Sequence, residues 1–312
     1  MLGRKSPFQV TLSLTNRCNF RCDYCHIPMQ RIDEMPTAQW LAAIDALHAA
    51  GMGRASIIGG EPLLREDAPE ILRHLKRAGV HVSMNTNGWF IPERIAELDG
   101  LDLACITLDG PEAVHDRQRR EGSYARVLRA IECLRARGVG VVTMTVVTAA
   151  GIDHVDHVLD VARAHGITAY FQLEHDARMD VHLPIASALS QSRVADFARG
   201  LLARKREGAP VGNSEASLVA QAERRRLLTC DACWAGTYHT YVFSDGTVSH
   251  CLLTRAQVPV GNGLAAGFVE AFEALGAPEG PGCSCVPSFE VNRALDLDPR
   301  AFLGALAVAS RR

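Results

Sequence analysis

The stretch "LTNRCNFRCDYCH", from Leu14 to His26, places three cysteines within eight residues. Cys18, Cys22 and Cys25 follow the spacing C-x3-C-x2-C. Three thiolates satisfy three irons of a cubane cluster and leave the fourth iron open, whereas structural zinc sites and purely structural iron–sulfur clusters use four ligands. His26 is the alternative fourth ligand for a zinc ion, but it follows Cys25 directly and turns onto the same ion with difficulty. The spacing favours an iron–sulfur cluster with one open iron.

The composition is that of a packed protein in a reducing compartment. Of the 312 residues, 47% are hydrophobic and 22% are charged, so a packed core is expected. The formal net charge of −2 gives no overall attraction to nucleic acid or to an anionic membrane. The N-terminus "MLGRKSPFQV" lacks an apolar signal core, and we expect a cytoplasmic protein with neither nucleic acid nor a membrane as its partner. In that compartment, ten cysteines indicate metal ligands or catalytic thiols before disulfides.

Strand and helix patterns alternate over about the first 175 residues. Six strands are predicted, at residues 9–15, 55–60, 80–85, 103–109, 139–148 and 169–174. All but the last precede a helix, and such alternation indicates a parallel sheet with right-handed crossovers. Polar or glycine-rich segments follow the strands, where parallel α/β folds bind their ligands. The residues that carry chemistry are therefore expected on one rim of the fold.

The rest of the chain has a different pattern. Residues 177–228 are predicted to be a mostly helical connecting segment after a core at residues 1–176. In residues 229–312, the stretch "YHTYVFSDGTVSHC" indicates a β-hairpin, because an Asp-Gly pair separates two strand-like runs. Cysteines flank this hairpin, so we expect residues 229–312 to form a second, smaller cysteine-bearing module.

Several motifs in the first half resemble the radical S-adenosylmethionine (SAM) superfamily. The cysteine motif has an aromatic residue, Tyr24, just before its last cysteine, and "GGEPLL" (59–64), "TNG" (86–88) and "LDGPEAVHDRQRREGS" (108–123) follow at predicted strand ends. The resemblance implies an α/β fold with a partial (β/α)6 TIM-like barrel and a small C-terminal hairpin and helix module. It also implies that a reduced [4Fe-4S] cluster splits SAM, and that the resulting 5′-deoxyadenosyl radical removes a hydrogen atom from a substrate.

The resemblance assigns SAM-binding roles to residues of these motifs. They are Tyr24, Gly59, Gly60, Glu61, Pro62, Asn87, Asp109 and Arg119. The two glycines let the backbone approach the methionyl amino group, the glutamate can accept a hydrogen bond from that group, and the tyrosine places backbone atoms near the adenine. The asparagine, aspartate and arginine are candidates for binding the ribose and the carboxylate of SAM. Alternatively, Asp109 simply begins a turn with Gly110.

A second group of cysteines lies in the C-terminal third. Its members are Cys230, Cys233, Cys251, Cys283 and Cys285. The stretch "CDACWAGTYHTYVFSDGTVSHC" resembles the SPASM or twitch extensions of the superfamily, which implies a second, auxiliary [4Fe-4S] cluster. A cubane cluster takes four cysteine ligands, so one of the five is surplus. A zinc ribbon built on the same hairpin is the alternative.

The surplus thiol leaves two chemical outcomes open. Cys251 or Cys230 could return a hydrogen atom to a substrate radical, which gives epimerisation. Otherwise the auxiliary cluster accepts a second electron, which gives oxidation or crosslinking. Glu174, at the end of the sixth predicted strand, is a candidate base. Cys105 and Cys133 are expected to be ordinary core residues.

Three functions remain open for the chain as a whole. The first is a radical SAM oxidoreductase or epimerase that acts on a small molecule of the natural-product type, with an external electron donor such as flavodoxin or ferredoxin. The second is a maturase for a ribosomally synthesised peptide, and the third is a non-catalytic metal-binding or electron-transfer protein. The first strand is expected to begin at about residue 9, which leaves no room for an N-terminal peptide-binding domain and favours a small molecule.

Overall fold

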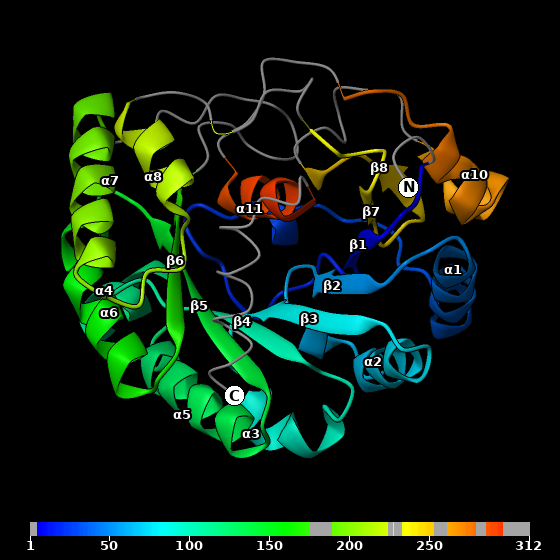
Figure 1. Cartoon of the computed structure of the whole chain (residues 1–312). Coiled ribbons are helices and arrows are strands. Elements are labelled where there is room, and N and C mark those ends of the chain that lie inside the picture. The colour runs from blue at the N-terminus through cyan, green and yellow to red at the C-terminus, as the bar shows by residue number, and fades with distance from the viewer. Residues whose placement is uncertain are drawn as a thin grey trace.

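A parallel β-sheet organises the computed structural model, which describes residues 5–174, 189–223, 227, 233–252, 261–278 and 285–295. Its first six strands are β1 (Gln9–Ser13), β2 (Arg54–Ile58), β3 (His81–Thr86), β4 (Leu103–Thr107), β5 (Gly140–Val147) and β6 (Thr168–Leu173). Each strand pairs in parallel with the next one along the chain. The predicted parallel α/β fold is confirmed, and Figure 1 shows the strands as an open arc rather than a closed barrel.

Helices connect these strands and lie on the convex side of the arc (Figure 1). They are α1 (Thr37–Ala49), α2 (Ala68–Arg77), α3 (Ile91–Arg94), α4 (Glu112–Gln118), α5 (Ser123–Ala136) and α6 (Val155–Ala164). Two further helices, α7 (Gln191–Arg206) and α8 (Glu215–Ala222), follow β6. The described part of the chain also contains four 3-10 turns: η1 (Ile27–Met29), η2 (Pro62–Leu64), η3 (Ile95–Glu97) and η4 (Ile152–His154).

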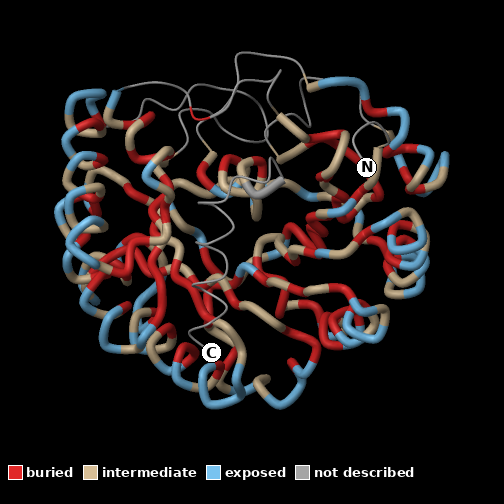
Figure 2. The backbone as a smooth tube through the Cα atoms, in the orientation of Figure 1, coloured by how far each residue is buried: buried red, intermediate tan, exposed pale blue. Residues whose placement is uncertain are grey.

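The two faces of the sheet differ in chemistry because alternate residues of a strand point to opposite sides. Residues such as Ile57, Ile106 and Phe171 belong to the buried core together with helix residues such as Trp40 and Leu72. Figure 2 shows this buried layer along the strands and the inner sides of the helices. The opposite positions on the same strands form the concave face and include Ser56, Ser83, Asn85, Cys105, Thr107, Tyr170 and Gln172. Apolar residues of β5 such as Met144 and Val146 share this face, and a mixture of apolar surface with a few polar groups is typical of a binding cavity.

The predicted hairpin is present, but it continues the main sheet. Strands β7 (His239–Val242) and β8 (Thr247–Ser249) are antiparallel, and Gly246 has the positive φ of +80° that their tight turn requires. Strand β7 also pairs in parallel with β1, and β9 (Gly261–Asn262) completes a nine-stranded sheet in the order β6-β5-β4-β3-β2-β1-β7-β8-β9. The hairpin is thus fastened by backbone hydrogen bonds to the strand that precedes the first cysteine motif.

The last helices complete the described structure. Helices α9 (Gly263–Ala266) and α10 (Phe268–Glu273) follow β9, and α11 (Val286–Leu295) lies on the concave side of the arc (Figure 1). The backbone amide of Val286, the first residue of α11, donates to Oε1 of Gln172 in β6 at 2.7 Å. Helix α11 is therefore joined directly to the last strand of the barrel.

None of the helices that the structure describes is long and apolar enough to cross a membrane.

Candidate active site

Three cysteines lie in the loop that follows β1. We call this loop, residues 16–26, the cluster loop. Cys18, Cys22 and Cys25 are half-buried, and the amide of Cys25 donates to the carbonyl of Cys22 at 3.0 Å, which turns the loop back on itself. Burial raises the pKa of all three thiols, to about 11 for Cys22. Cys18 and Cys25 each raise the pKa of Cys22 further. The three sulfurs therefore lie near enough to influence one another.

Nitrogen donors point at these sulfurs. The amide of Phe20 lies 3.4 Å from Sγ of Cys18, and Nδ2 of Asn87 lies 3.9 Å from the same atom. The amide of Ile27 is directed at the thiol of Cys25 and lowers its pKa. Hydrogen bonds to sulfur are among the features by which proteins hold iron–sulfur clusters and set their potential. The donor set of this loop fits a cluster held by three thiolates.

His26, the alternative zinc ligand, is placed elsewhere. Its Nδ1 atom lies 3.5 Å from Sδ of Met29 in the following 3-10 turn. Within the ranges that the structure describes, no three His, Cys, Asp or Glu side chains form a group suited to a single metal ion.

The GGEP segment runs along the backbone that leads into the cluster loop. The amide of Gly60 donates to the carbonyl of Thr15 at 2.7 Å, and the amide of Glu61 donates to the carbonyl of Arg17 at 2.9 Å. Gly59 has a φ of +155°, and a Cβ atom there would lie 2.4 Å from the Thr15 carbonyl oxygen. A Cβ atom on Gly60 would lie 2.3 Å from the Arg17 carbonyl oxygen. Only glycines allow this close approach of two backbones.

The variant Gly60→Ala is expected to lose stability and to lose iron from the cluster loop. Because the added methyl group meets backbone and not a flexible side chain, we expect a loss of about 1–3 kcal/mol in the free energy of unfolding. Urea unfolding and iron analysis of reconstituted protein measure both effects. Gly276→Ala is the matched control, since a Cβ atom there meets nothing within 4 Å. Equal stability of the two variants would contradict the prediction.

Glu61 is fully buried and ties the GGEP segment to the "TNG" segment after β3. Its carboxylate accepts hydrogen bonds from the amide of Leu63 at 3.1 Å, the hydroxyl of Thr86 at 2.9 Å and the amide of Asn87 at 2.8 Å. Burial raises its pKa to about 7, although these hydrogen bonds oppose the increase. Pro62, also buried, begins the following 3-10 turn. The position of Asn87, whose side chain reaches Cys18, therefore depends on Glu61.

A pH series should expose the buried Glu61 carboxyl group. Between its ordinary pKa of 4.5 and about 7, the folded chain keeps a proton that the unfolded chain releases, so this group makes folding less favourable as the pH rises through that window. The span corresponds to roughly 3 kcal/mol. Urea unfolding at about pH 5 and about pH 8 should therefore show a steeper loss in the native protein than in Glu61→Gln. Parallel profiles for the two proteins would contradict this.

Tyr24, Asp109 and Arg119 form a second buried connection to the cluster loop. Nε of Arg119 donates to Oδ2 of Asp109 at 2.5 Å, Nη2 donates to the Tyr24 hydroxyl, and that hydroxyl donates to Oδ2 of Asp109 at 3.2 Å. The side chains of Asp109 and Arg119 are 0% and 8% exposed. Oδ1 of Asp109 accepts from the amide of Val146 at 3.0 Å. The network joins the loop to the ends of β4 and β5 and to the end of α4.

The charge of Arg119 acts on the cluster loop. It lowers the pKa of the Cys22 and Cys25 thiols and thus opposes the effect of their burial. A buried guanidinium favours anionic sulfur, which is the form that binds iron. It also carries five N–H donors, so binding Asp109 and Tyr24 does not exhaust its capacity to bind a carboxylate.

His115 and Asp116, within the stretch 108–123, have local structural partners. Nδ1 of His115 accepts from the Asp109 amide at 3.2 Å, and burial lowers the pKa of His115 to about 4. Asp116 accepts from the amides of Gly122 and Tyr124, at 2.6 and 2.8 Å, and so fastens the start of α5. These contacts shape the turn that brings Arg119 to Asp109.

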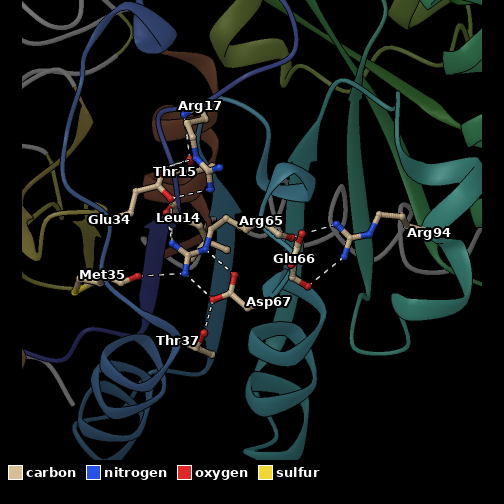
Figure 3. A network of polar contacts seen from close by, with 10 residues as sticks. All are labelled: Leu14, Thr15, Arg17, Glu34, Met35, Thr37, Arg65, Glu66, Asp67 and Arg94. Atoms are coloured by element: carbon tan, nitrogen blue, oxygen red, sulfur yellow. Dashed lines mark hydrogen bonds and ion pairs between the residues drawn. The ribbon is translucent and has the colours of Figure 1, made fainter.

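Arg65, which the sequence analysis missed, braces the entrance to the cluster loop (Figure 3). Its guanidinium donates to the carbonyls of Leu14 and Met35, at 3.3 and 3.2 Å, and pairs with Asp67 at 2.6 Å. Glu34 joins the same network at 3.4 Å from Arg65. The available signal in the sequence was a charged residue directly after "GGEPLL". A positively charged side chain at this position donates a hydrogen bond to the backbone carbonyl at the bend after β1.

Three cysteines of the second group converge from separate segments. Cys285 is half-buried, burial raises the pKa of its thiol, and Cys251 and Cys233 are near enough to raise it further. The hydroxyl of Ser288 donates to Sγ of Cys285 at 3.3 Å, and Nδ2 of Asn292 lies 4.0 Å from Sγ of Cys233. We refer to Cys233, Cys251 and Cys285 as the auxiliary thiols.

The remaining predicted positions fall into three groups. Cys230 and Cys283 lie outside the described residues. Glu174 is half-buried just after β6, and burial raises the pKa of its carboxyl group. Cys133 packs against the core as expected, but Cys105 is on the opposite face of β4 from core residues such as Ile106. Strand alternation turns Cys105 to the concave side, where burial raises the pKa of its thiol to about 12.

The fold and this arrangement of motifs define a class of protein. Residues 12–162 match the family model described as "Radical SAM superfamily", and this match spans the cysteine, GGEP and "TNG" motifs and the turn that leads to Arg119. The chain therefore contains a radical SAM domain, and a SAM-binding [4Fe-4S] cluster is the cofactor that this class implies.

Individual relatives extend the similarity beyond that domain. The GTP 3′,8-cyclase of Corynebacterium glutamicum (strain R) is 29% identical over 290 residues, which cover 81% of this chain and 74% of the cyclase. The mycofactocin maturase MftC of Mycobacterium tuberculosis is 30% identical over 263 residues, which cover 80% of this chain and 65% of the maturase. The crystal structure of Streptococcus suis SuiB bound to S-adenosylmethionine has a TM-score of 0.68 at 14% identity, covering 84% of this chain and 64% of SuiB. The chain thus spans less than two thirds of the length of MftC and SuiB, and the SuiB likeness concerns the fold.

Proposed function

We propose that this protein uses SAM to remove a hydrogen atom from a small-molecule substrate, and that an auxiliary [4Fe-4S] cluster assists oxidation or epimerisation of the resulting substrate radical. The observation that carries the proposal is the meeting of three motifs. The GGEP backbone, the "TNG" asparagine and the Arg119 network all contact the loop that bears Cys18, Cys22 and Cys25. Each contact joins the loop to a different strand end.

Different residues of this chain would bind the cluster and SAM. Cys18, Cys22 and Cys25 would hold a cluster whose open iron binds SAM, and when bound this group supplies the electron that splits SAM. Asn87 would hold one thiolate, while Arg119 would balance negative charge and bind the SAM carboxylate. Asp109, Tyr24, Gly59, Gly60, Glu61 and Pro62 would shape the rest of this pocket. Here Glu61 acts through the two backbone segments that it joins.

The auxiliary thiols support the second part of the proposal. Cys233 and Cys251 come from two separate segments and lie near enough to Cys285 to raise the pKa of its thiol, as expected for thiolates that share one cluster. Cys230 or Cys283 would be the fourth ligand. The proximity of Cys251 to Cys285 favours the role of ligand over that of a hydrogen donor. An external donor such as flavodoxin or ferredoxin would supply electrons.

The concave face would form the substrate cavity. Ser56, Ser83, Asn85 and Thr107 offer hydroxyl and amide groups there, and Glu174 at the end of β6 would be the base. A maturase acting on a peptide is the second candidate, because the name of the relative MftC describes a maturase. A hydroxyl- and amide-bearing cavity also suits a peptide backbone.

Two assays test the proposed function. Anaerobically reconstituted protein given dithionite and SAM should release 5′-deoxyadenosine, and a protein that only carries electrons would release none. Turnover in heavy water with candidate substrates separates the two outcomes. Deuterium incorporated at carbon indicates epimerisation, whereas a product lighter by two hydrogen atoms without deuterium indicates oxidation.

A further inference from the structure

Cys285, Ser288 and Asn292 share one face of α11. Cys285 directly precedes the helix, Ser288 follows it by three residues, and Asn292 follows Ser288 by four. Residues at these spacings are neighbours on a helix surface. Two of the three auxiliary thiols, Cys285 and Cys233, receive hydrogen bonds from this face.

Ser288 is bound to the sulfur of Cys285 by two groups. Its hydroxyl donates to Sγ at 3.3 Å, and its backbone amide is directed at the same atom. The amide of Phe289 donates to the carbonyl of Cys285 at 3.0 Å, which places the cysteine at the helix N-terminus. The hydroxyl is the part of this arrangement that a substitution can remove without changing the backbone.

Asn292 holds the segment that carries Cys233. Its side chain is 1% exposed, and its Oδ1 atom accepts from the amide of Trp234 at 2.6 Å. Its Nδ2 atom donates to the carbonyl of Ser288 at 2.7 Å and lies 4.0 Å from Sγ of Cys233. One buried side-chain amide therefore links α11, which follows Cys285, to the segment that carries Cys233.

The helix itself is anchored to the barrel. Oε1 of Gln172 in β6 accepts from the amide of Val286 at 2.7 Å, and Oε1 of Glu290 accepts from the amide of Ser214 at 2.8 Å. Residues of α8 pack against Val286 and Phe289 in a small apolar cluster. Contacts with β6, Ser214 and α8 therefore fix the position of α11 and of the hydrogen-bond donors that it carries, independently of the auxiliary thiols.

We propose that Ser288 and Asn292 are positioning residues of the auxiliary cluster and that their hydrogen bonds to the thiolates make its reduction potential less negative. The physical reason is that one-electron reduction adds negative charge, and donors aimed at sulfur stabilise the more negative state. A less negative potential makes the cluster a better electron acceptor, which the oxidation outcome requires. This inference rests on the proposed function, because it presupposes the second cluster.

The test isolates that cluster in the full-length chain. A protein with Cys18→Ala, Cys22→Ala and Cys25→Ala retains only the auxiliary cluster, whose midpoint potential is then measured by an EPR-monitored redox titration. In this background, Ser288→Ala and Asn292→Asp should shift the potential to more negative values. Ser288→Thr, which keeps the hydroxyl, should restore the parent value. Ser217→Ala is the matched control, because Ser217 is a buried helical serine that donates to a carbonyl oxygen and should leave the potential unchanged.

The outcomes separate the two proposals. Full iron content with an unmoved potential in both Ser288→Ala and Asn292→Asp overturns the role of these residues and leaves the proposed function intact. A triple alanine variant that binds no iron removes the auxiliary cluster from the proposed function. A negative shift in the two variants and none in Ser217→Ala supports the inference.

Discussion

Cys22→Ala should abolish the release of 5′-deoxyadenosine from SAM. Three thiolates are the minimum that leaves one open iron in a cubane cluster, and a loop with only two cannot hold that cluster firmly. Cys22 is also flanked by the buried charge of Arg119, so the loop around it is organised for a thiolate. The expected result is no measurable 5′-deoxyadenosine, with bound iron reduced to the share of the proposed auxiliary cluster. Chromatography of the nucleoside and iron analysis of anaerobic protein measure both.

Cys133→Ala provides the matched control for this experiment. Cys133 packs against the core on α5 and is part of neither group of cysteines. The same chemical change there should leave iron content and SAM cleavage close to those of the native protein. Undiminished SAM cleavage by Cys22→Ala would show that the cluster loop is not the site of cleavage.

Asp109→Ala should destabilise the fold by about 3–5 kcal/mol, because it leaves the buried charge of Arg119 without its carboxylate. The Asp109 side chain is wholly buried, and the amide of Val146 would lose its acceptor in the same variant. The Tyr24 hydroxyl would also lose a partner, which frees the cluster loop from the end of β4. Anaerobic urea unfolding measures the change in the free energy of unfolding.

An exposed ion pair provides the comparison for Asp109. Asp160 pairs with Arg163 at 2.6 Å, but their side chains are 72% and 60% exposed. Asp160→Ala should therefore change stability by less than about 0.5 kcal/mol. Asp109→Asn keeps an oxygen that can accept from Val146 and should fall between the two. Similar losses in Asp109→Ala and Asp160→Ala would mean that burial of the first pair has no energetic consequence.

The sequence by itself determined the parallel α/β fold and the placement of the first site. Six strands were predicted close to their observed positions, such as residues 103–109 for β4 (Leu103–Thr107), because strand periodicity and flanking turns are local signals. Motifs at the ends of parallel strands necessarily meet on one rim, so the approach of the GGEP and "TNG" segments to the cluster loop followed from the order of the strands. The Asp-Gly hairpin was predictable for the same local reason.

Only the tertiary structure decided the contacts between distant segments. It paired β7 with β1, turned Cys105 to the concave face, gave Glu61 three buried donors and brought Cys285 to Cys233 and Cys251. Each of these depends on strand register or on a polar group finding its partner far along the chain. Such choices minimise unpaired buried groups over the whole fold, and no local pattern encodes them.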